Sequence, residues 1–234
     1  MCAGAPTKRA RLTNLTCMST VALDRKDPEM SFFADGAYTR KRVKRGETLY
    51  RAGEVFDSLY ALRSGFFKSS AVLEDGRDQV TGFHMAGEIV GTDGIGTERH
   101  TADLVALEDS EVCIIPYGRL EGAGLQRLLQ KAMSRELVRD QGVMMVLGTM
   151  RADERLAAFL LNLSQRFVAL GFSPSDFHLR MTREEIGSYI GLSLETVSRL
   201  FSRFQDEGLV AVRQKHVQLV DRIRLKSLMS HDSH

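Results

Sequence analysis

The stretch MTREEIGSYIGLSLETVSRLFSRF, residues 181–204, decides the fold of the C-terminal part of this chain. Thr182 and Glu185 form a capping-box pattern, in which the hydroxyl accepts from a free amide of the first helical turn and the carboxylate reaches back. Gly191 then ends that helix, because only glycine enters the left-handed backbone region without steric cost. Ser193 is a suitable N-cap for a second helix that starts at once. Two short helices joined by a glycine turn predict a helix-turn-helix.

The second of these helices has two different faces. Val197, Leu200 and Phe204 recur at helical spacing and predict a buried side, while Gly187 in the first helix allows a close crossing. The other face carries groups that can contact base edges and phosphates. An ordinary helical hairpin with a solvated outer face is the alternative. The candidate DNA contacts are Thr182, Ser193, Glu195, Thr196, Ser198, Arg199, Ser202, Arg203 and, further along the chain, Lys215.

Length and composition limit the remaining possibilities. A chain of 234 residues suits one large or two small domains, and a net charge of +2 requires any nucleic-acid contact to come from a local basic patch. No apolar run is long enough to span a bilayer and the N-terminus lacks a secretory h-region, so we expect a cytoplasmic protein that does not enter a membrane. Three cysteines (Cys2, Cys17 and Cys113) are an odd number at wide spacings, which does not predict a disulfide framework.

The N-terminal half changes character near Tyr38. Residues 1–37 mix glycine, proline and scattered charge without a sustained period, so we expect a poorly structured arm. Residues 38–118 contain short segments rich in β-branched and aromatic residues between glycines, and Asp75-Gly76 is a strong hairpin signal. The basic run at residues 40–45 is typical of the solvated edge of a strand. This pattern predicts an antiparallel sandwich or a jelly-roll β-barrel.

A long helix is expected over residues 119–150. Strong helix formers fill residues 125–150, and Met133, Leu137, Met144 and Leu147 recur at coiled-coil-like spacing. After Val143 the helix is apolar nearly all round, so it must be covered on all sides. We expect its own barrel to cover one side and a second copy of the chain to cover the other, giving a homodimer. A core made wholly within one chain is the alternative.

Residues 151–229 form the last predicted unit. An amphipathic helix over residues 156–167 ends at Gly171, the helix-turn-helix follows, and two short strands then flank a basic turn at residues 213–216. This hairpin is a wing whose Lys215 can contact phosphate or remain solvated. A short helix over residues 221–229 ends the unit. The complete chain is predicted to be α+β, with a β-barrel, a long helix and a winged helix-turn-helix.

Several short motifs resemble the CRP/FNR superfamily, and most closely its fumarate and nitrate reduction regulator (FNR) group. The motifs are GETLYRAG (46–53), LYALRSG (59–65), QVTGFH (79–84), AGEIVG (86–91), ERLAAFL (154–160) and ETVSRL (195–200). The resemblance runs from about residue 38 to residue 220. It implies a cyclic-nucleotide-binding-like jelly-roll barrel, a dimerisation helix and a winged helix that reads an inverted repeat.

The resemblance also implies specific contacts. The FNR group reads TTGAT half-sites, and the family's E-x-x-S-R element falls on Glu195, Ser198 and Arg199. That placement agrees with the chemistry, because a glutamate can accept from cytosine and an arginine can fork onto guanine O6 and N7. Relatives act as activators by contacting RNA polymerase through barrel loops. Residues 87–91 are expected in such a loop here, with Gly87 and Glu88 as the contacts.

The chain departs from this group at the sensor. FNR proteins hold an oxygen-labile iron–sulfur cluster with three closely spaced N-terminal cysteines and one in the barrel. Cys113 matches the barrel cysteine, and Cys17 and Cys2 are the only other candidate ligands among the three cysteines. A fourth ligand would have to come from elsewhere, such as His100. Alternatively Cys113 is a small buried residue on a strand, and the abrupt loss of resemblance before residue 38 also fits a sequencing frame error or a wrong start.

Three functions therefore compete at this point. The first is a dimeric transcription regulator that responds to oxygen or redox state. The second keeps DNA binding but places a cyclic nucleotide in the barrel, where Glu88 resembles a ribose contact, although the phosphate-binding element is interrupted at Arg99-His100-Thr101. The third is an enzyme, for which the chain offers no nucleophile–base pair, metal signature or P-loop.

Overall fold

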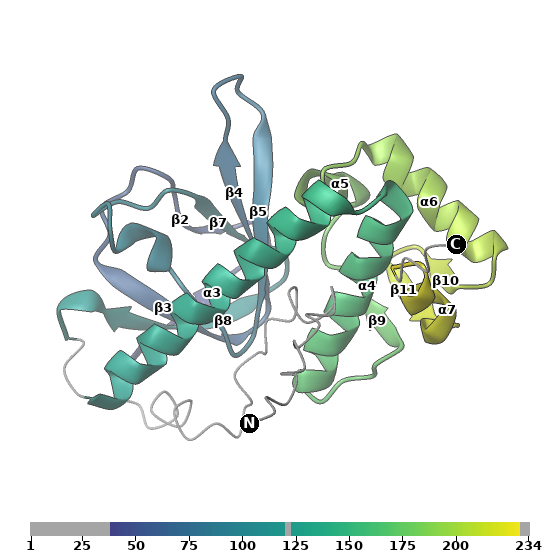
Figure 1. The fold of residues 1–234 in the computed structure, drawn as a ribbon. Helices are drawn as coiled ribbons and strands as arrows, with labels where there is room; N and C mark the ends of the chain where they lie inside the picture. Colours follow the sequence, from purple (N-terminus) through teal and green to yellow (C-terminus); the bar gives the residue numbers. More distant parts are fainter. Residues whose placement is uncertain (1–37, 120–122, 230–234) are drawn as a thin grey trace, which may run out of the picture.

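The computed structural model describes residues 38–119 and 123–229 of the chain (Figure 1). The predicted N-terminal arm, with Cys2 and Cys17, lies outside the described residues. From the described part, an N-terminal β domain leads into a long helix and then into a smaller helical domain with its own sheet. This order confirms the predicted α+β architecture. No helix in the described ranges combines the length and apolar character needed to span a membrane.

The N-terminal domain consists of two antiparallel four-stranded sheets. One has the order β1-β8-β3-β6, formed by β1 (Thr39–Val43), β8 (Ser110–Pro116), β3 (Ser58–Ser64) and β6 (Ile89–Val90). The other has the order β2-β7-β4-β5, formed by β2 (Thr48–Tyr50), β7 (Asp103–Ala106), β4 (Phe66–Val72) and β5 (Asp78–Met85). Side chains from both sheets, among them Leu62 and Phe67 at 0% exposure, form the core between them. Two short 3-10 helices, η1 (Thr92–Gly94) and η2 (Tyr117–Arg119), lie in its connections.

Two sequence signals of this domain are confirmed. Asp75 and Gly76 lie in the turn of the β4–β5 hairpin, which projects from the barrel (Figure 1). The basic run overlaps β1, which in the part of the chain that the structure describes pairs only with β8 and so forms an edge of its sheet. The segment after Gly87 differs from our expectation of a loop. Ile89 and Val90 form the short strand β6, because both side chains are apolar and pack in the core against β3.

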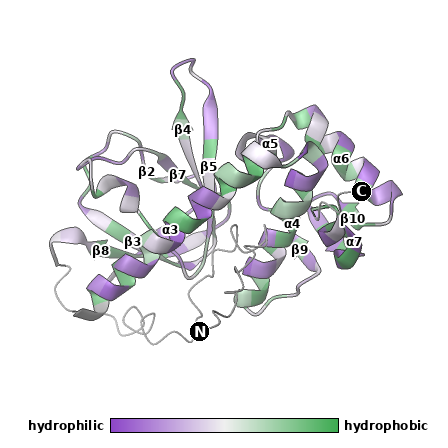
Figure 2. Cartoon of the chain, viewed as in Figure 1, coloured by the Kyte–Doolittle hydropathy of each residue, from purple (hydrophilic) through white to green (hydrophobic). Residues whose placement is uncertain are grey.

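The long helix α3 (Ala123–Thr149) runs diagonally across the barrel and reaches the C-terminal domain (Figure 1). Its first part covers the outer face of one sheet, where Leu125 and Leu128 pack against strand residues. Figure 2 shows apolar and polar turns alternating along the helix, with apolar residues concentrated at its C-terminal end. The helix α4 (Ala152–Ala169) follows after a break at Met150 and Arg151.

The C-terminal domain packs three further helices and a small sheet on α4. These are α5 (Arg183–Ile190) and α6 (Leu194–Asp206), followed by β10 (Val210–Arg213), β11 (His216–Leu219) and the short helix α7 (Arg222–Ser227). The predicted wing is confirmed as the β10–β11 hairpin. The sequence analysis missed β9 (Asp176–His178), which pairs with β11 and completes a three-stranded sheet. Its three residues are too few to show a strand period.

Candidate nucleic-acid interface

The helix-turn-helix forms as the caps predict. The Thr182 hydroxyl accepts from the Glu185 amide at 3.1 Å, and the Glu185 carboxylate accepts from the Thr182 amide at 2.7 Å. Gly191 ends α5 in the left-handed conformation, with φ of 66°. The Ser193 side chain accepts from the Thr196 amide at the start of α6. The sequence therefore fixes both ends of the turn that places α6 on the surface.

A close approach between the two helices sets the angle at which α6 is presented. A Cβ atom added to Gly187 would lie 2.4 Å from the carbonyl oxygen of Leu192. Only glycine leaves room for that backbone contact. On its inner side α6 buries Val197, Leu200 and Phe204, as predicted, and also Phe201 at 1% exposure. Its opposite side is left to the solvent.

A row of hydrogen-bonding side chains follows the outer side of α6. The Ser193 hydroxyl donates to the Thr196 hydroxyl at 3.1 Å, and that hydroxyl accepts from a terminal nitrogen of Arg199 at 3.4 Å. Ser202, one turn further, donates to the backbone carbonyl of Ser198 at 3.2 Å. Thr196 therefore orients the Arg199 guanidinium, whose other N–H donors make no hydrogen bond within this row. These donors suit a bidentate contact to a base edge.

Glu195 stands exposed in the first turn of α6. Hydrogen bonds from its own amide and from Ser193 lower the pKa of its carboxyl, and the charge of Arg199 acts in the same direction. The side chain is therefore an acceptor at neutral pH, as a contact to a cytosine amino group requires.

A shallow basic hollow lies beside this row. Its lining residues are Arg183, Ser198, Arg199, Ser202, Arg203 and Asp206. The sequence analysis did not select Arg183, which comes from the start of α5. Its guanidinium lies over the ring of Phe201 at 5.2 Å from the ring centroid. Three arginines against one aspartate make this hollow attractive to a phosphate backbone.

Two of the predicted basic contacts have partners within the chain. Arg203 pairs with Glu207 at 2.7 Å and lies 3.4 Å from Asp153. The ammonium of Lys215, at the tip of the wing, donates to the carbonyl of Arg180 at 3.2 Å. Both side chains are exposed, so a phosphate can replace these contacts at small cost.

Other side chains fasten the helix-turn-helix to the rest of the molecule. Arg155 on α4 donates to two carbonyls at the end of α3, that of Leu147 at 2.7 Å and that of Met150 at 2.9 Å. Its guanidinium also lies 3.4 Å from the carbonyl of Ile190 at the end of α5. On the hairpin, Lys68 pairs with Glu185 at 3.0 Å. The long helix and the barrel therefore both hold the DNA-facing unit in place.

Glu88 requires a correction to its predicted role. Its side chain is 8% exposed, and its carboxylate lies 2.6 Å from Arg166 of α4 and 3.7 Å from Arg139 of α3. The neighbouring Gly87 is buried as well, with its amide donating to the carbonyl of Leu62. Neither residue offers a polymerase an exposed surface in this arrangement. Glu88 instead joins the barrel to the two helices that follow it.

The environment of Glu88 explains its ionisation. Burial alone would raise the pKa of this carboxyl, but the charges of Arg166 and Arg139 and a hydrogen bond from His84 lower it from its ordinary value of 4.5 to about 2. Burial also lowers the pKa of His84, with the charge of Arg139 acting in the same direction. A carboxylate held between two guanidiniums is not available to a ribose.

The remaining barrel cavity does not suit a cyclic phosphate either. A cavity of about 210 Å³ lies between the barrel and α3, and its walls include the carboxylates of Asp93, Glu136 and Asp140. The Arg99 guanidinium, in the segment expected to hold phosphate, instead donates to the carbonyl of Gly53 at 2.6 Å. Three carboxylates outnumber the one guanidinium of the lining, that of Arg139, which pairs with Glu136 at 2.9 Å, so the cavity opposes a bound anion.

Cys113 lies on β8 at 1% exposure, on the sheet face covered by the start of α3. Its buried neighbours are Leu59, Ala61, Ile89, Ile115, Leu125 and Leu128. His100, the suggested fourth ligand, stacks on Tyr50 at 3.7 Å between ring centroids and lies 3.3 Å from Asp93. In residues 38–119 and 123–229, no three histidine, cysteine or acidic side chains come together as a metal site. Cys113 is the one thiol of the described residues, and the other candidate ligands, Cys2 and Cys17, lie outside them.

Comparisons with known proteins agree with this geometry. Residues 154–228 match the Crp-like helix-turn-helix domain family, and residues 40–126 match the cyclic nucleotide-binding domain family. The transcriptional regulatory protein btr of Bordetella pertussis is 49% identical over 199 residues, which cover 83% of this chain and 82% of that protein. The fumarate and nitrate reduction regulatory protein of Escherichia coli strain K12 is 44% identical over 197 residues, covering 82% and 79%.

A solved structure shows the same fold. FixK2 from Bradyrhizobium japonicum superposes with a TM-score of 0.74 and 29% identity, covering 82% of this chain and 97% of that one. The helix-turn-helix, the barrel and these similarities agree, and none points to an enzyme. The chain belongs to the CRP/FNR superfamily of DNA-binding transcription regulators, within its fumarate and nitrate reduction regulator group.

Proposed function

We propose that this regulator binds inverted TTGAT half-sites as a homodimer and adjusts transcription to oxygen or redox state. The observation that carries the proposed DNA contact is the outer face of α6, where Ser198 and Arg199 follow Glu195 by about one helical turn, beside a basic hollow. A glutamate and an arginine at this spacing suit neighbouring cytosine and guanine edges in the major groove.

The surface of α3 supports the dimer. Its large exposed apolar residues are Met133, Leu137, Val138, Met144 and Met145, with Leu137 60% and Met144 65% exposed. A soluble monomer seldom leaves such a row uncovered along one helix. Pairing of two α3 helices would cover these residues and place two copies of α6 on one side of the dimer. Two recognition helices about one turn of DNA apart would match an inverted repeat.

The signal is proposed from the relatives, which include an Escherichia coli regulator of fumarate and nitrate reduction. The described residues supply Cys113 alone as a thiol, and it is buried, so the proposed response to oxygen includes no step through a cluster. Contact with RNA polymerase, and location in the cytoplasm, belong to the same proposal. After the correction at Glu88, we expect exposed barrel or helix-turn-helix surface to meet the polymerase.

Duplex binding tests this function. We expect the full-length protein to bind a duplex with two inverted TTGAT half-sites at least about a thousandfold more tightly than a scrambled duplex. Sedimentation of the complex should give two chains per duplex. Repeating the titration without oxygen and after exposure to air tests the signal, and iron and sulfide should be measured in the same samples. Equal affinity for both duplexes would contradict the proposal.

A further inference from the structure

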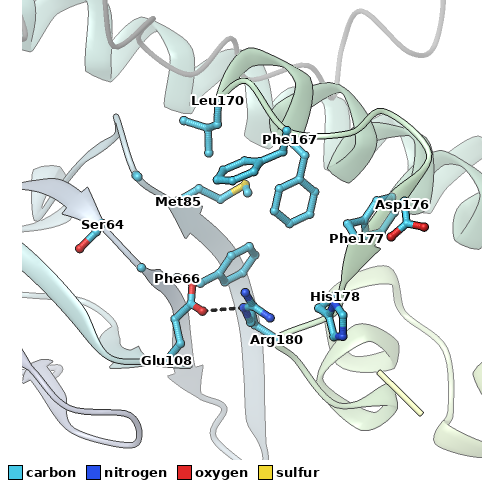
Figure 3. Close-up of a pocket in the computed structure, with 13 residues that line it drawn as sticks. Ser64, Phe66, Met85, Glu108, Phe167, Leu170, Asp176, Phe177, His178 and Arg180 are labelled. Atoms are coloured by element: carbon cyan, nitrogen blue, oxygen red, sulfur yellow. Dashed lines mark ion pairs between the residues drawn. The ribbon is translucent and has the colours of Figure 1, made fainter. Parts of the chain in front are cut away.

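A separate cavity lies where the barrel meets the DNA-binding domain (Figure 3). Its volume is about 360 Å³, within the range of about 300–1,000 Å³ that small-molecule sites occupy. Phe66, Met85 and Glu108 line it from the barrel, and Phe167 and Arg180 line it from the other domain. It contains no residue of α3 or α6, so it is distinct from the dimer stripe and from the DNA-facing side.

Four phenylalanines (Phe66, Phe167, Phe172 and Phe177) line this domain-seam cavity. Phe167 stacks on Phe177 with ring centroids 5.2 Å apart, and it meets Phe172 edge-on at 6.2 Å. Phe66 and Phe177 are almost fully buried, whereas Phe172 is 56% exposed. Packing therefore holds the inner rings in place, while an exposed ring remains available to a bound molecule. Such walls favour a planar apolar body.

A guanidinium, that of Arg180, stands at the edge of these rings. Nε of Arg180 lies 2.6 Å from a carboxylate oxygen of Glu108 (Figure 3). The two terminal nitrogens of that guanidinium make no hydrogen bond or ion pair with any residue in the described parts of the chain. The other acid, Asp176, is engaged by His216 at 2.5 Å. The cavity thus offers hydrogen-bond donors whose positive charge is already balanced.

This charge balance defines the ligand. An anion at the terminal nitrogens of Arg180 would also meet the repulsion of the Glu108 carboxylate, which offsets part of its attraction to the guanidinium. A neutral acceptor, such as a carbonyl or hydroxyl oxygen, can take a guanidinium hydrogen bond without that repulsion. We propose that the domain-seam cavity binds a small uncharged aromatic molecule that carries one hydrogen-bond acceptor.

The position of the cavity gives this ligand a regulatory effect, which rests on the proposed DNA-binding function. A molecule that contacts Phe66 and Phe167 together binds best when the two domains have the arrangement seen here. Its binding therefore shifts the population toward that arrangement. The size of the shift is set by the ratio of the ligand's affinity for this arrangement of the two domains to its affinity for other arrangements. Because the same seam orients α6 relative to the barrel, DNA affinity changes with it.

The test uses the full-length protein and prodan, an uncharged naphthalene with a carbonyl acceptor and environment-sensitive fluorescence. We expect saturable binding with one prodan per chain and a blue-shifted emission. Leu170→Trp places a large side chain in the cavity and should weaken binding at least about tenfold. Arg180→Met removes the donors and should weaken it several-fold. Val168→Trp adds the same ring to the same helix outside the cavity and should bind prodan like the wild type.

The second measurement is affinity for the inverted-repeat duplex with and without saturating prodan. We expect at least a threefold change for the wild type and for Val168→Trp, and none for Leu170→Trp. Absence of saturable prodan binding, or equal binding by Leu170→Trp with an unchanged melting temperature, would overturn the site. Prodan binding without any effect on DNA affinity would overturn its regulatory role. Failure to prefer the inverted repeat would contradict the proposed function and leave the binding site standing.

Discussion

Two arginine–glutamate pairs in this molecule have nearly the same geometry and very different surroundings. Arg166 and Glu88 lie 2.6 Å apart with side chains 4% and 8% exposed, at the joint between the barrel and α4. Arg203 and Glu207 lie 2.7 Å apart with side chains 51% and 33% exposed, at the end of α6. The distance between the charged atoms therefore does not distinguish a structural ion pair from a pair whose arginine can exchange its carboxylate for another anion.

The surroundings decide what each pair can do. A buried charge that loses its partner is left without water, so the joint between domains is fixed by Arg166 and Glu88. An exposed arginine that leaves its carboxylate is at once solvated, so Arg203 is free to turn toward a phosphate. The buried ion pair therefore lies at the joint between the barrel and α4, and the exposed ion pair, whose arginine can turn to another anion, lies on the DNA-facing side.

The largest expected effect comes from breaking the buried pair. Arg166→Ala leaves Glu88 charged and buried, and should lower the free energy of unfolding by about 3–5 kcal/mol. Urea unfolding followed by circular dichroism measures this change. Arg203→Ala, the matched exposed variant, should leave the midpoint unchanged. Equal midpoint shifts for the two variants would remove the distinction drawn between the pairs.

The pH dependence of stability sharpens the same contrast. The folded pKa of Glu88 is about 2, below its ordinary value of 4.5, so the unfolded chain takes up a proton first as pH falls. Its stabilisation is therefore complete above about pH 4.5 and is lost between pH 4.5 and pH 2. Glu88→Gln should flatten this part of the stability curve. A variant curve parallel to that of the wild type over this range would show that Glu88 does not titrate as described.

A smaller effect is expected at the helix crossing that presents the DNA-facing side. Gly187→Ala places a methyl group against the Leu192 carbonyl, and should lower the free energy of unfolding by about 1–3 kcal/mol. Sequence-specific DNA binding should weaken as well. Gly96→Ala is the control, because nothing lies within 4 Å of its added Cβ. Thermal unfolding and duplex titration measure both. Unchanged stability of Gly187→Ala would mean that the crossing is looser than the structure shows.

The smallest effect is expected at the wing. Lys215→Ala removes one phosphate contact without touching a base, so it should weaken specific and scrambled duplexes alike and reduce the salt dependence of binding by about one unit. Titrations at several salt concentrations measure this slope. A loss confined to the specific duplex would assign Lys215 to base recognition instead.

The sequence predicted the parts of this molecule whose structure is determined locally. The capping pair Thr182 and Glu185, the turn glycine Gly191 and the cap Ser193 act over a few residues, and each is confirmed. The Asp75-Gly76 hairpin and the edge position of β1 follow in the same way from local signals. The candidate contacts on α6 were likewise predicted to lie on one outer face, and they do.

The parts that sequence did not predict depend on distant partners. Glu88 resembled an exposed ligand or polymerase contact because nothing near it in sequence reveals Arg166, 78 residues away. Arg155 and Arg183 do not differ in sequence from other arginines on exposed helix faces. Their contacts become visible only when the fold brings α3, α5 and α6 together around them. Cys113 matched a ligand position, yet apolar residues from β3, β6 and α3 surround it.

We expect Arg199 on α6 to read a base of the half-site. The most direct test crosses Arg199→Ala with substitution of the guanine in TTGAT, and measures all four affinities by fluorescence anisotropy. Arg45→Ala, an exposed arginine in the turn after β1, is the control. Unfolding curves establish that both variants remain folded.

We expect Arg199→Ala to bind the TTGAT duplex with about 1–3 kcal/mol less binding free energy than the wild type. Replacing the guanine should then cost this variant almost no further binding free energy. Wild type and Arg45→Ala should lose a similar amount on replacement of the guanine alone. If Arg199→Ala still discriminates the guanine as strongly as the wild type does, Arg199 does not read that base and the account of this interface is wrong.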